Sequence, residues 1–306
     1  MVELPNGLIA YGPDTNCTLA LCPVEWSILQ YRPSVPANAV FIALFAVALI
    51  IHAYEGFRWR QTLTSFAIPM ILGLLDEIIG YIGRLIMYHN PFSFSGFLMQ
   101  IICITTAPVF FSAAIYVTLA RTINYLDISL ARFNPKFFYW FFIPCDIISL
   151  VFQAAGGALS SVSTGNNEAG VDMSLFGLSF QVFTLVVFIA FTADYMYRFY
   201  RRNNGFHNRV ANPSRFRLFV TGLWSAIILI LIRCVYRIDE LSEGYSGDIF
   251  HNEGLFYGLE SAIMTLAVFA LCIGQPGLGL KPGPQEVYTA PDTEMNSVQG
   301  SKPPSM

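Results

Sequence analysis

Residues 65–88 read SFAIPMILGLLDEIIGYIGRLIMY, an apolar stretch that carries Asp76, Glu77 and Arg84 in its interior. A helix rises about 1.5 Å per residue, so a stretch of this length can cross the roughly 30 Å of hydrocarbon in a bilayer. A charged side chain at the centre of a lone membrane helix costs roughly 2.5–3.5 kcal/mol on insertion scales. We therefore expect these charges to face other helices or a polar cavity inside a bundle.

Six further stretches have the same apolar character, at residues 38–57, 97–120, 137–160, 174–197, 216–236 and 255–274. Hydrophobic residues make up 55% of the chain and charged residues only 12%, about half the share found in soluble domains. The fold predicted from these observations is all-α: a polytopic membrane protein whose seven transmembrane helices form one bundle. The net charge of −3 gives no reason to expect a nucleic acid partner.

Basic residues alternate between the connections in a way that predicts orientation. The connections expected on one side hold Arg58, Arg60, Arg121, Arg132, Lys136, Arg198, Arg201, Arg202, Arg209, Arg215 and Arg217, whereas the other side holds only Arg32 and Arg237. Positive loops stay in the cytoplasm, so the N-terminus is predicted outside and the C-terminus inside. The expected organisation is an extracellular tail over 1–37, the bundle over 38–276, and a disordered cytoplasmic tail over 277–306 that is rich in Pro, Gly, Ser and Thr.

The two tails and the longest basic connection carry three further predictions. Asn16-Cys17-Thr18 is an N-glycosylation sequon, which can be used if this tail is extracellular. Cys17 and Cys22 lie in the same tail and can form a disulfide there. The connection Arg198–Arg217 is basic, and its simplest interpretation is a topology signal that lies beside anionic inner-leaflet lipid.

Polar residues follow single faces of several spans. Glu77, Tyr81 and Arg84 have i, i+4, i+7 spacing in the second span, and Glu253, Tyr257 and Glu260 repeat it in the seventh. Intramembrane ionisable residues often mark function, although structural pairing explains any single one equally well. The predicted polar cavity or substrate site comprises Glu77, Tyr81, Arg84, Tyr116, Asp146, Gln153, Gln181, Arg233, Arg237, Glu253, Tyr257 and Glu260.

Particular partners can be predicted within this set. We expect Arg84 to pair with Glu77 or Glu260, and Arg233 to pair with Glu253 or Glu260. Asp146 lies too deep in the fourth span to reach water easily. It is therefore either an acid that takes up and releases a proton or the fixed partner of a polar group such as Tyr116 or Gln181. Kinks are expected at Pro69, Pro108 and Pro144, where freed backbone groups could face a cavity.

Several short motifs, in order along the chain, resemble one family. They are DEIIGYIGR at 76–84, Ala107-Pro108 with AAIY at 113–116, Asp146-Ile-Ile-Ser149 with Gln153, Gly177-Leu178 with Gln181, and RCVYR at 233–237 followed by Glu240 and Glu253. Together they resemble the fungal lipid-translocating exporters, the seven-span RTA-like proteins. Two positions depart from that pattern: Glu260, where members usually carry Asp, and Cys145, where they tend to carry Gly.

The resemblance implies a plasma-membrane protein that moves sphingoid long-chain bases or related amphiphiles and supports resistance to toxic lipids; one branch moves porphyrins. Its partners would be membrane lipids: sphingoid bases, phospholipids or sterol-like amphiphiles. A sphingoid base carries a cationic amine, for which Glu260, Glu253 or Asp146 could provide the counter-charge. The chain lacks a GxxxxGK[ST] motif, so we expect no direct use of ATP.

Two other classes of function remain open at this stage. A seven-span receptor or lipid stress sensor would share the predicted topology, but the chain lacks the Asp/Glu-Arg-Tyr and Asn-Pro-x-x-Tyr motifs of rhodopsin-like receptors. An intramembrane zinc enzyme needs three neighbouring His ligands. His52 and His207 are predicted on one side, and His89 and His251 on the other. We therefore expect neither catalysis nor a metal or other cofactor.

Overall fold

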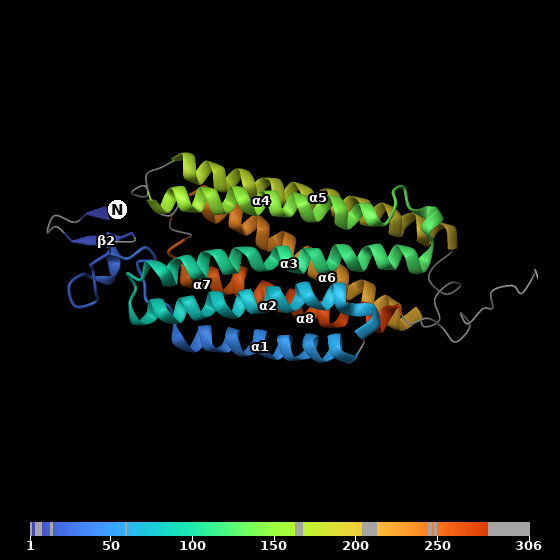
Figure 1. The fold of residues 1–306 in the computed structure, drawn as a ribbon, viewed down its shortest axis with the longest axis horizontal. Coiled ribbons are helices and arrows are strands. Elements are labelled where there is room, and N and C mark those ends of the chain that lie inside the picture. The colour runs from blue at the N-terminus through green and yellow to red at the C-terminus, as the bar shows by residue number, and fades with distance from the viewer. Residues whose placement is uncertain are drawn as a thin grey trace, which may run out of the picture.

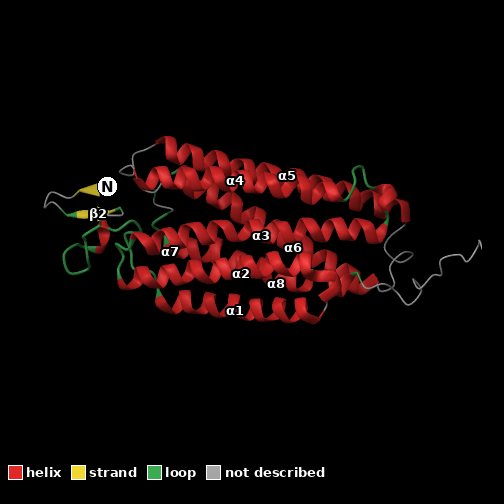
Figure 2. Ribbon diagram, viewed as in Figure 1, coloured by secondary structure: helices red, strands yellow, loops and turns green. Residues whose placement is uncertain are grey.

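The structure is a computed structural model that describes residues 2–3, 8–12, 15–58, 60–162, 168–203, 213–243, 247 and 250–280. Helices run nearly parallel to one long axis and account for most of the described chain (Figure 2). Seven of them, in the described part, are long and apolar enough to cross a membrane. The predicted all-α, seven-span class is therefore confirmed.

The first six spans are single helices. Their bounds are α1 (Val35–Arg58), α2 (Arg60–His89), α3 (Phe94–Leu126), α4 (Lys136–Val162), α5 (Glu168–Asn203) and α6 (Pro213–Ser242). The seventh span is composite: α7 (Glu253–Leu255), a π-helical segment η3 (Phe256–Ala262) and α8 (Ile263–Ile273). The remaining elements are short: strands β1 (Val2–Glu3) and β2 (Ile9–Tyr11), the 3-10 turns η1 (Val24–Trp26) and η2 (Ile128–Leu130), and the helix α9 (Pro276–Gly279).

Several helices that are consecutive in the chain also lie side by side in the bundle (Figure 1). The α2 helix packs on α1 and α3, α4 packs on α5, and α6 packs on α8, which also contacts α1. The α4–α5 pair forms one side of the bundle, and α1 lies on the opposite side (Figure 1). We call the end that carries β1 and β2 the hairpin end, and the other end the α9 end.

Glycines allow two of these helix pairs to come into backbone contact. A Cβ added to Gly83 on α2 would lie 2.8 Å from the carbonyl oxygen of Gly96 on α3. A Cβ added to Gly156 on α4 would lie 2.5 Å from the carbonyl oxygen of Gly170 on α5. Both distances are too short for any larger residue, so these positions set how closely the helices approach.

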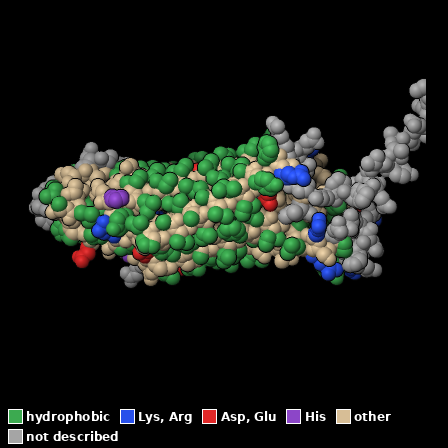
Figure 3. Space-filling view, turned by 90° about the horizontal axis from the view of Figure 1, so that it is seen from below, with side chains coloured by type: hydrophobic (Ala, Val, Ile, Leu, Met, Phe, Trp, Pro, Cys, Tyr) green, Lys and Arg blue, Asp and Glu red, His purple; other side chains and the backbone are tan. Residues whose placement is uncertain are grey.

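The outer surface of the bundle suits lipid. Apolar side chains cover the middle of the face in Figure 3, whereas Lys and Arg side chains gather toward the α9 end. Exposed apolar residues of α1 include Val40, Val47, Ile50 and Phe57. Continuous apolar surface of this extent marks a membrane-facing protein. This chain is a multi-pass membrane protein.

A compact extension covers the hairpin end. The two strands pair antiparallel, and Cys17 and Cys22 are joined by a disulfide with their Cα atoms 5.7 Å apart. Asn16 is exposed, and its side-chain oxygen accepts a hydrogen bond of 2.7 Å from the backbone N–H of Ile9. This hydrogen bond uses the side-chain oxygen of Asn16 and not its amide nitrogen, which is the atom to which a glycan would be attached.

Two sequence predictions need correction. The disordered tail was predicted from 277, but Pro276–Gly279 is helical and Leu280 packs on the core; residues 281–306 lie outside the described part. The basic connection is shorter than Arg198–Arg217, since α5 continues to Asn203 and α6 starts at Pro213. Pro69, Pro108 and Pro144 lie inside helices, and the seventh span contains the π-helix η3.

Candidate functional site

An ion pair between Arg233 of α6 and Glu260 of η3 lies at the centre of the bundle. Both side chains are 1% exposed. The Nε of Arg233 donates to Oε1 of Glu260 at 2.9 Å, and its Nη2 donates to the backbone oxygen of Ile104 on α3 at 2.7 Å. One guanidinium therefore links three helices. Glu260 was one of the two partners predicted for Arg233.

Two residues of α2 complete what we call the central polar cluster, which comprises Glu77, Tyr81, Arg233 and Glu260. Glu77 is 1% exposed and Tyr81 is fully buried. Glu77 lies within electrostatic range of both Arg233 and Glu260. Within the described part of the chain, no cationic side chain lies within ion-pair distance of Glu77. Arg233 lies farther away and is already paired with Glu260. The cluster thus holds two acids and one base.

Three oxygen atoms of this cluster have no hydrogen-bond partner among the described residues. They are Oε1 of Glu77, the hydroxyl of Tyr81 and Oε2 of Glu260. A buried oxygen without a partner costs free energy, so native proteins usually provide water or a ligand at such points. Aromatic rings border the site: the Tyr81 ring lies 5.7 Å from that of Phe41 and 5.6 Å from that of Phe45.

A second group lies nearer the hairpin end and is centred on Arg84, which is fully buried. Its Nε donates to Oδ1 of Asn38 at 3.1 Å, and its Nη2 donates to the hydroxyl of Tyr31 at 3.2 Å. Its carboxylate partner is Glu253, at 3.7 Å. The prediction that Arg84 pairs with Glu77 or Glu260 was therefore wrong.

Glu253 ties the extension to the seventh span. Its Oε1 accepts hydrogen bonds from the backbone N–H of Ser34 at 2.7 Å and from the hydroxyl of Tyr257 at 2.9 Å. Burial raises the pKa of Tyr31, and the nearby Arg84 opposes that rise, so the phenol remains protonated at neutral pH. We call Tyr31, Ser34, Asn38, Arg84, Glu253 and Tyr257 the hairpin-end network.

Arg84 is also enclosed by rings. Its guanidinium carbon lies 4.0 Å from the centre of the Phe256 ring and 5.3 Å from that of Tyr257. Cation–π contacts of this kind help to hold a desolvated guanidinium. One of its nitrogens, Nη1, has no hydrogen-bond partner among the described residues.

A third group joins α3, α4 and α5. Among the described residues, no hydrogen bond connects it to the central polar cluster. The hydroxyl of Tyr116 donates to Oδ2 of Asp146 at 2.9 Å, and Thr184 lies 3.4 Å from Oδ1. Gln181 does not bond to Asp146 here; it accepts from Nε2 of Gln153 at 3.0 Å. Of the two partners proposed for Asp146, the structure therefore selects Tyr116.

Eleven of the twelve predicted site residues thus separate into three groups. The twelfth, Arg237, pairs with Glu240 on the same helix. Sequence reasoning missed Tyr31, Ser34 and Asn38, which lie before the first predicted span or at its first position. The signal available in the sequence was an Asn at the first position of the first apolar stretch, four residues after Ser34. Arg198, assigned to lipid, is paired with Asp194 at 2.8 Å.

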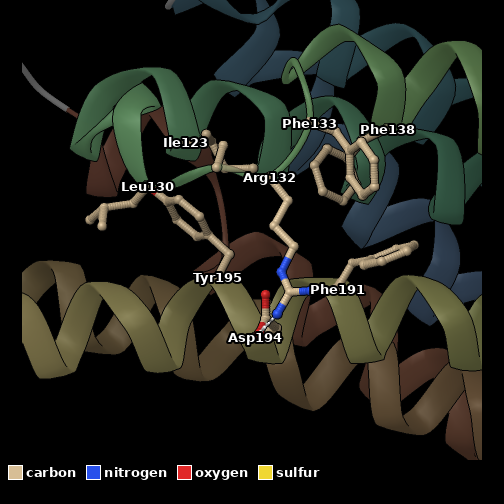
Figure 4. Close-up of a pocket in the computed structure, with 9 residues that line it drawn as sticks. Ile123, Leu130, Arg132, Phe133, Phe138, Phe191, Asp194 and Tyr195 are labelled. Carbon is tan, nitrogen blue, oxygen red and sulfur yellow. Dashed lines mark hydrogen bonds and ion pairs between the residues drawn. The ribbon is translucent and has the colours of Figure 1, made fainter.

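A small hollow near the α9 end is not a candidate site. Figure 4 shows the side chain of Arg132 reaching across it toward Asp194, to which it bonds at 3.0 Å. Tyr195 and Phe191 of α5 form the floor. The space suits about one water molecule and is far too small for a lipid.

Comparison with known proteins identifies the family. Residues 70–282 match the family described as RTA1 like protein. The chain belongs to the RTA1-like protein family. The match covers most of the second span and all of the third to the seventh, and it includes the three polar groups except for Tyr31, Ser34 and Asn38.

Among the relatives, the sphingoid long-chain base transporter RSB1 of Saccharomyces cerevisiae is 28% identical over 304 residues, covering 86% of this chain and 79% of the relative. The protoporphyrin uptake protein 1 of the same yeast is 28% identical, covering 81% and 91%. Protein RTM1 is 26% identical, covering 82% and 92%. No solved structure is significantly similar to this chain.

Proposed function

We propose that this protein moves sphingoid long-chain bases, or amphiphiles with the same cationic head and single apolar tail, across the plasma membrane. Relatives named as sphingoid long-chain base transporters support a lipid transporter role for a chain of this family. The observation that carries the proposal is the composition of the central polar cluster, two acids and one base, in which Glu77 is an acid without an ion-pair partner in the described part of the chain.

The amine of a sphingoid base fits this cluster in charge and in hydrogen bonding. A primary ammonium carries one positive charge and three N–H donors, as Lys does. The cluster offers one acid more than it has bases, and three oxygen atoms without partners among the described residues: Oε1 of Glu77, the Tyr81 hydroxyl and Oε2 of Glu260. A bound ammonium would favour the ionised form of Glu77. The Tyr81 ring adds an aromatic face to the site. We therefore assign the principal counter-charge to Glu77, ahead of Glu260, Glu253 or Asp146.

Access to the cluster requires movement, because its members are at most 1% exposed. The π-helix η3 carries Glu260 and borders Tyr81 through Phe256. Wide π-turns concentrate at functional sites and can convert to α-helix with a local rotation. We propose that such a rotation of η3 opens the cluster to one leaflet and then to the other, without direct use of ATP.

The proposed orientation places the hairpin end outside and the α9 end in the cytoplasm. The distribution of basic residues supports it, as do the disulfide and the exposed Asn16 at the hairpin end. The exposed Arg201, Arg202, Arg215 and Arg217 would then lie beside anionic inner-leaflet lipid. Arg198 is no longer included, because Asp194 neutralises it.

The test uses purified full-length protein in liposomes and three fluorescent lipids. A sphingoid base should cross faster than in protein-free liposomes, whereas its N-acylated analogue, which has no amine charge, and phosphatidylcholine should not. Glu77→Gln should reduce base movement at least ten-fold, and the surface control Asp239→Asn should not. Equal movement of the charged and uncharged analogues would overturn the amine site. Ligand-induced signalling without any lipid movement would favour the receptor alternative.

A porphyrin is the second candidate cargo, favoured by the relative named as a protoporphyrin uptake protein. A porphyrin carboxylate needs a cationic donor, and Nη1 of Arg84 has no partner among the described residues. The flat rings of Phe256 and Tyr257 lie beside it. Protoporphyrin movement in the same liposomes that depends on Arg84 and not on Glu77 would select this cargo.

A further inference from the structure

A thiol, an imidazole and a carboxylate meet at the α9 end of the bundle, away from all three polar groups described above. Cys272 is the second-last residue of α8, and its Sγ lies 3.3 Å from Nε2 of His52 on α1. The other ring nitrogen, Nδ1, lies 3.7 Å from Oε2 of Glu55, one turn further along α1. The order carboxylate, imidazole, thiol is that of a nucleophile with its base and an orienting acid.

The arrangement is built by two features of the chain. His52 and Glu55 are three residues apart on α1, so they share a face of that helix, and α1 packs on α8. His52 is 1% exposed, and its ring also packs against Phe66 at 5.9 Å between ring centres. A ring held in this way presents Nε2 to Cys272 and Nδ1 to Glu55.

These contacts are not explained by packing alone. Within the described residues, neither Nδ1 of His52 nor Oε2 of Glu55 has a hydrogen-bond partner, although both atoms are buried. Small movements of the Glu55 side chain would close the 3.7 Å gap to His52. Among the described residues, no group of three His, Cys, Asp or Glu side chains could hold a metal ion, and each ring nitrogen of His52 faces only one of the other two groups.

The position of Cys272 indicates the chemistry of the electrophile. Cys272 is half-buried and precedes Ile273, the last residue of the span, whose side chain is exposed. Exposed apolar residues of the same helix, such as Leu266, continue from there toward the bilayer centre. An acyl chain attached to this sulfur would therefore lie along apolar surface, with its thioester at the depth of the head groups.

We propose that Cys272 is a site of S-acylation, with a long-chain acyl thioester such as acyl-coenzyme A as donor and His52 as the base. His52 takes the thiol proton while Sγ attacks the acyl carbonyl carbon. The bond between that carbon and the donor sulfur then breaks, and the leaving thiolate receives the proton from His52. One thioester is exchanged for another, so no oxidant or reductant is needed. Glu55 orients the ring of His52 during the transfer.

The experiment incubates purified full-length protein in detergent micelles with palmitoyl-coenzyme A and follows hydroxylamine-sensitive acylation by intact mass. Wild type should gain one acyl group, and Cys272→Ser should gain none. Cys103→Ser and Cys145→Ser, which remove half-buried free cysteines elsewhere in the spans, should behave as wild type. His52→Gln should slow acylation by about a hundred-fold, the lower part of the range for a positioned base. Glu55→Gln should slow it less.

Each outcome decides the proposal. Absence of acylation in wild type, or acylation that persists in Cys272→Ser, would overturn it. Unchanged acylation in His52→Gln would also overturn it, because the thiol would then react without the base. Gel filtration identifies variants that misfold, because they no longer elute as a monodisperse peak. Glu55→Gln, whose side chain is partly exposed, provides a second test of the same triad if His52→Gln does not fold.

Discussion

Arg233 and Glu260 form an ion pair between α6 and the π-helix of the seventh span, where each side chain is 1% exposed. The guanidinium also bonds to the backbone of α3, so the pair links three spans. Removing one partner leaves the other charge without compensation in a low-dielectric interior, at a cost of about 3–5 kcal/mol.

We therefore predict that Arg233→Leu strongly destabilises the protein, and that Arg233→Leu combined with Glu260→Leu restores much of the loss. The measurement is thermal unfolding in a mild detergent, together with the amount of protein at the cell surface. Arg217→Leu, an exposed arginine on the same helix, is the matched control. A double variant as unstable as Arg233→Leu alone would show that the hydrogen bond to Ile104 matters more than the charge pair.

The hairpin-end network predicts a different response. Arg84→Leu should destabilise the protein and loosen the N-terminal extension, because Asn38 and Tyr31 each lose a hydrogen-bond donor and Glu253 loses its ion-pair partner. Limited proteolysis of the extension reports the loosening directly. Glu253→Gln should be milder, since an amide oxygen can still accept from Ser34 and Tyr257. Equal protease sensitivity of wild type and Arg84→Leu would mean that the extension is held without this arginine.

Asp146 offers a test between a structural and a proton-exchanging role. Asp146→Asn keeps an oxygen for the Tyr116 hydroxyl, so we expect the fold to persist, whereas Asp146→Leu leaves that donor unpaired at a cost of about 1–3 kcal/mol. If Asp146 exchanges a proton during transport, Asp146→Asn abolishes the pH dependence of sphingoid base movement in liposomes. A pH dependence that survives in the folded variant assigns Asp146 a structural role only.

Two adjacent glycines of α4 give a prediction with an internal control. Gly156→Ala should destabilise by about 1–3 kcal/mol, because the new methyl would meet the backbone of α5. Gly157→Ala introduces a methyl with nothing within 4 Å and should be neutral or stabilise by up to about 1 kcal/mol through helix propensity. Denaturation midpoints of the two variants provide the comparison, and equal midpoints would contradict the α4–α5 packing.

The proposed orientation predicts which residues an impermeant thiol reagent can reach. Glu25→Cys, exposed at the hairpin end, should be labelled in intact cells, and Arg202→Cys, exposed near the α9 end, only after permeabilisation. Asn16 should carry a glycan that Asn16→Gln removes. Labelling of Arg202→Cys in intact cells would reverse the topology, move the Cys272 triad outside the cell and remove its access to cytosolic acyl donors.

The amino-acid sequence by itself determined the seven spans and the polar content of the bundle, because apolar length and helical periodicity are local properties. It left Glu253 and Glu260 as alternative partners for Arg233, and the structure selects Glu260. Only the tertiary structure decided how the polar residues are grouped.

In a regular α-helix, Glu253 and Glu260 of the seventh span would lie on one face. The π-helix η3 has more than 3.6 residues per turn, so the two side chains point in different directions. Glu260 therefore faces Arg233 inside the bundle, Glu253 faces Arg84 near the hairpin end, and Glu77 is left as the acid without a partner among the described residues. Which charges meet depends on helix rotation and on contacts between distant segments, such as Asn38 with Arg84 and His52 with Cys272, and no local pattern encodes either.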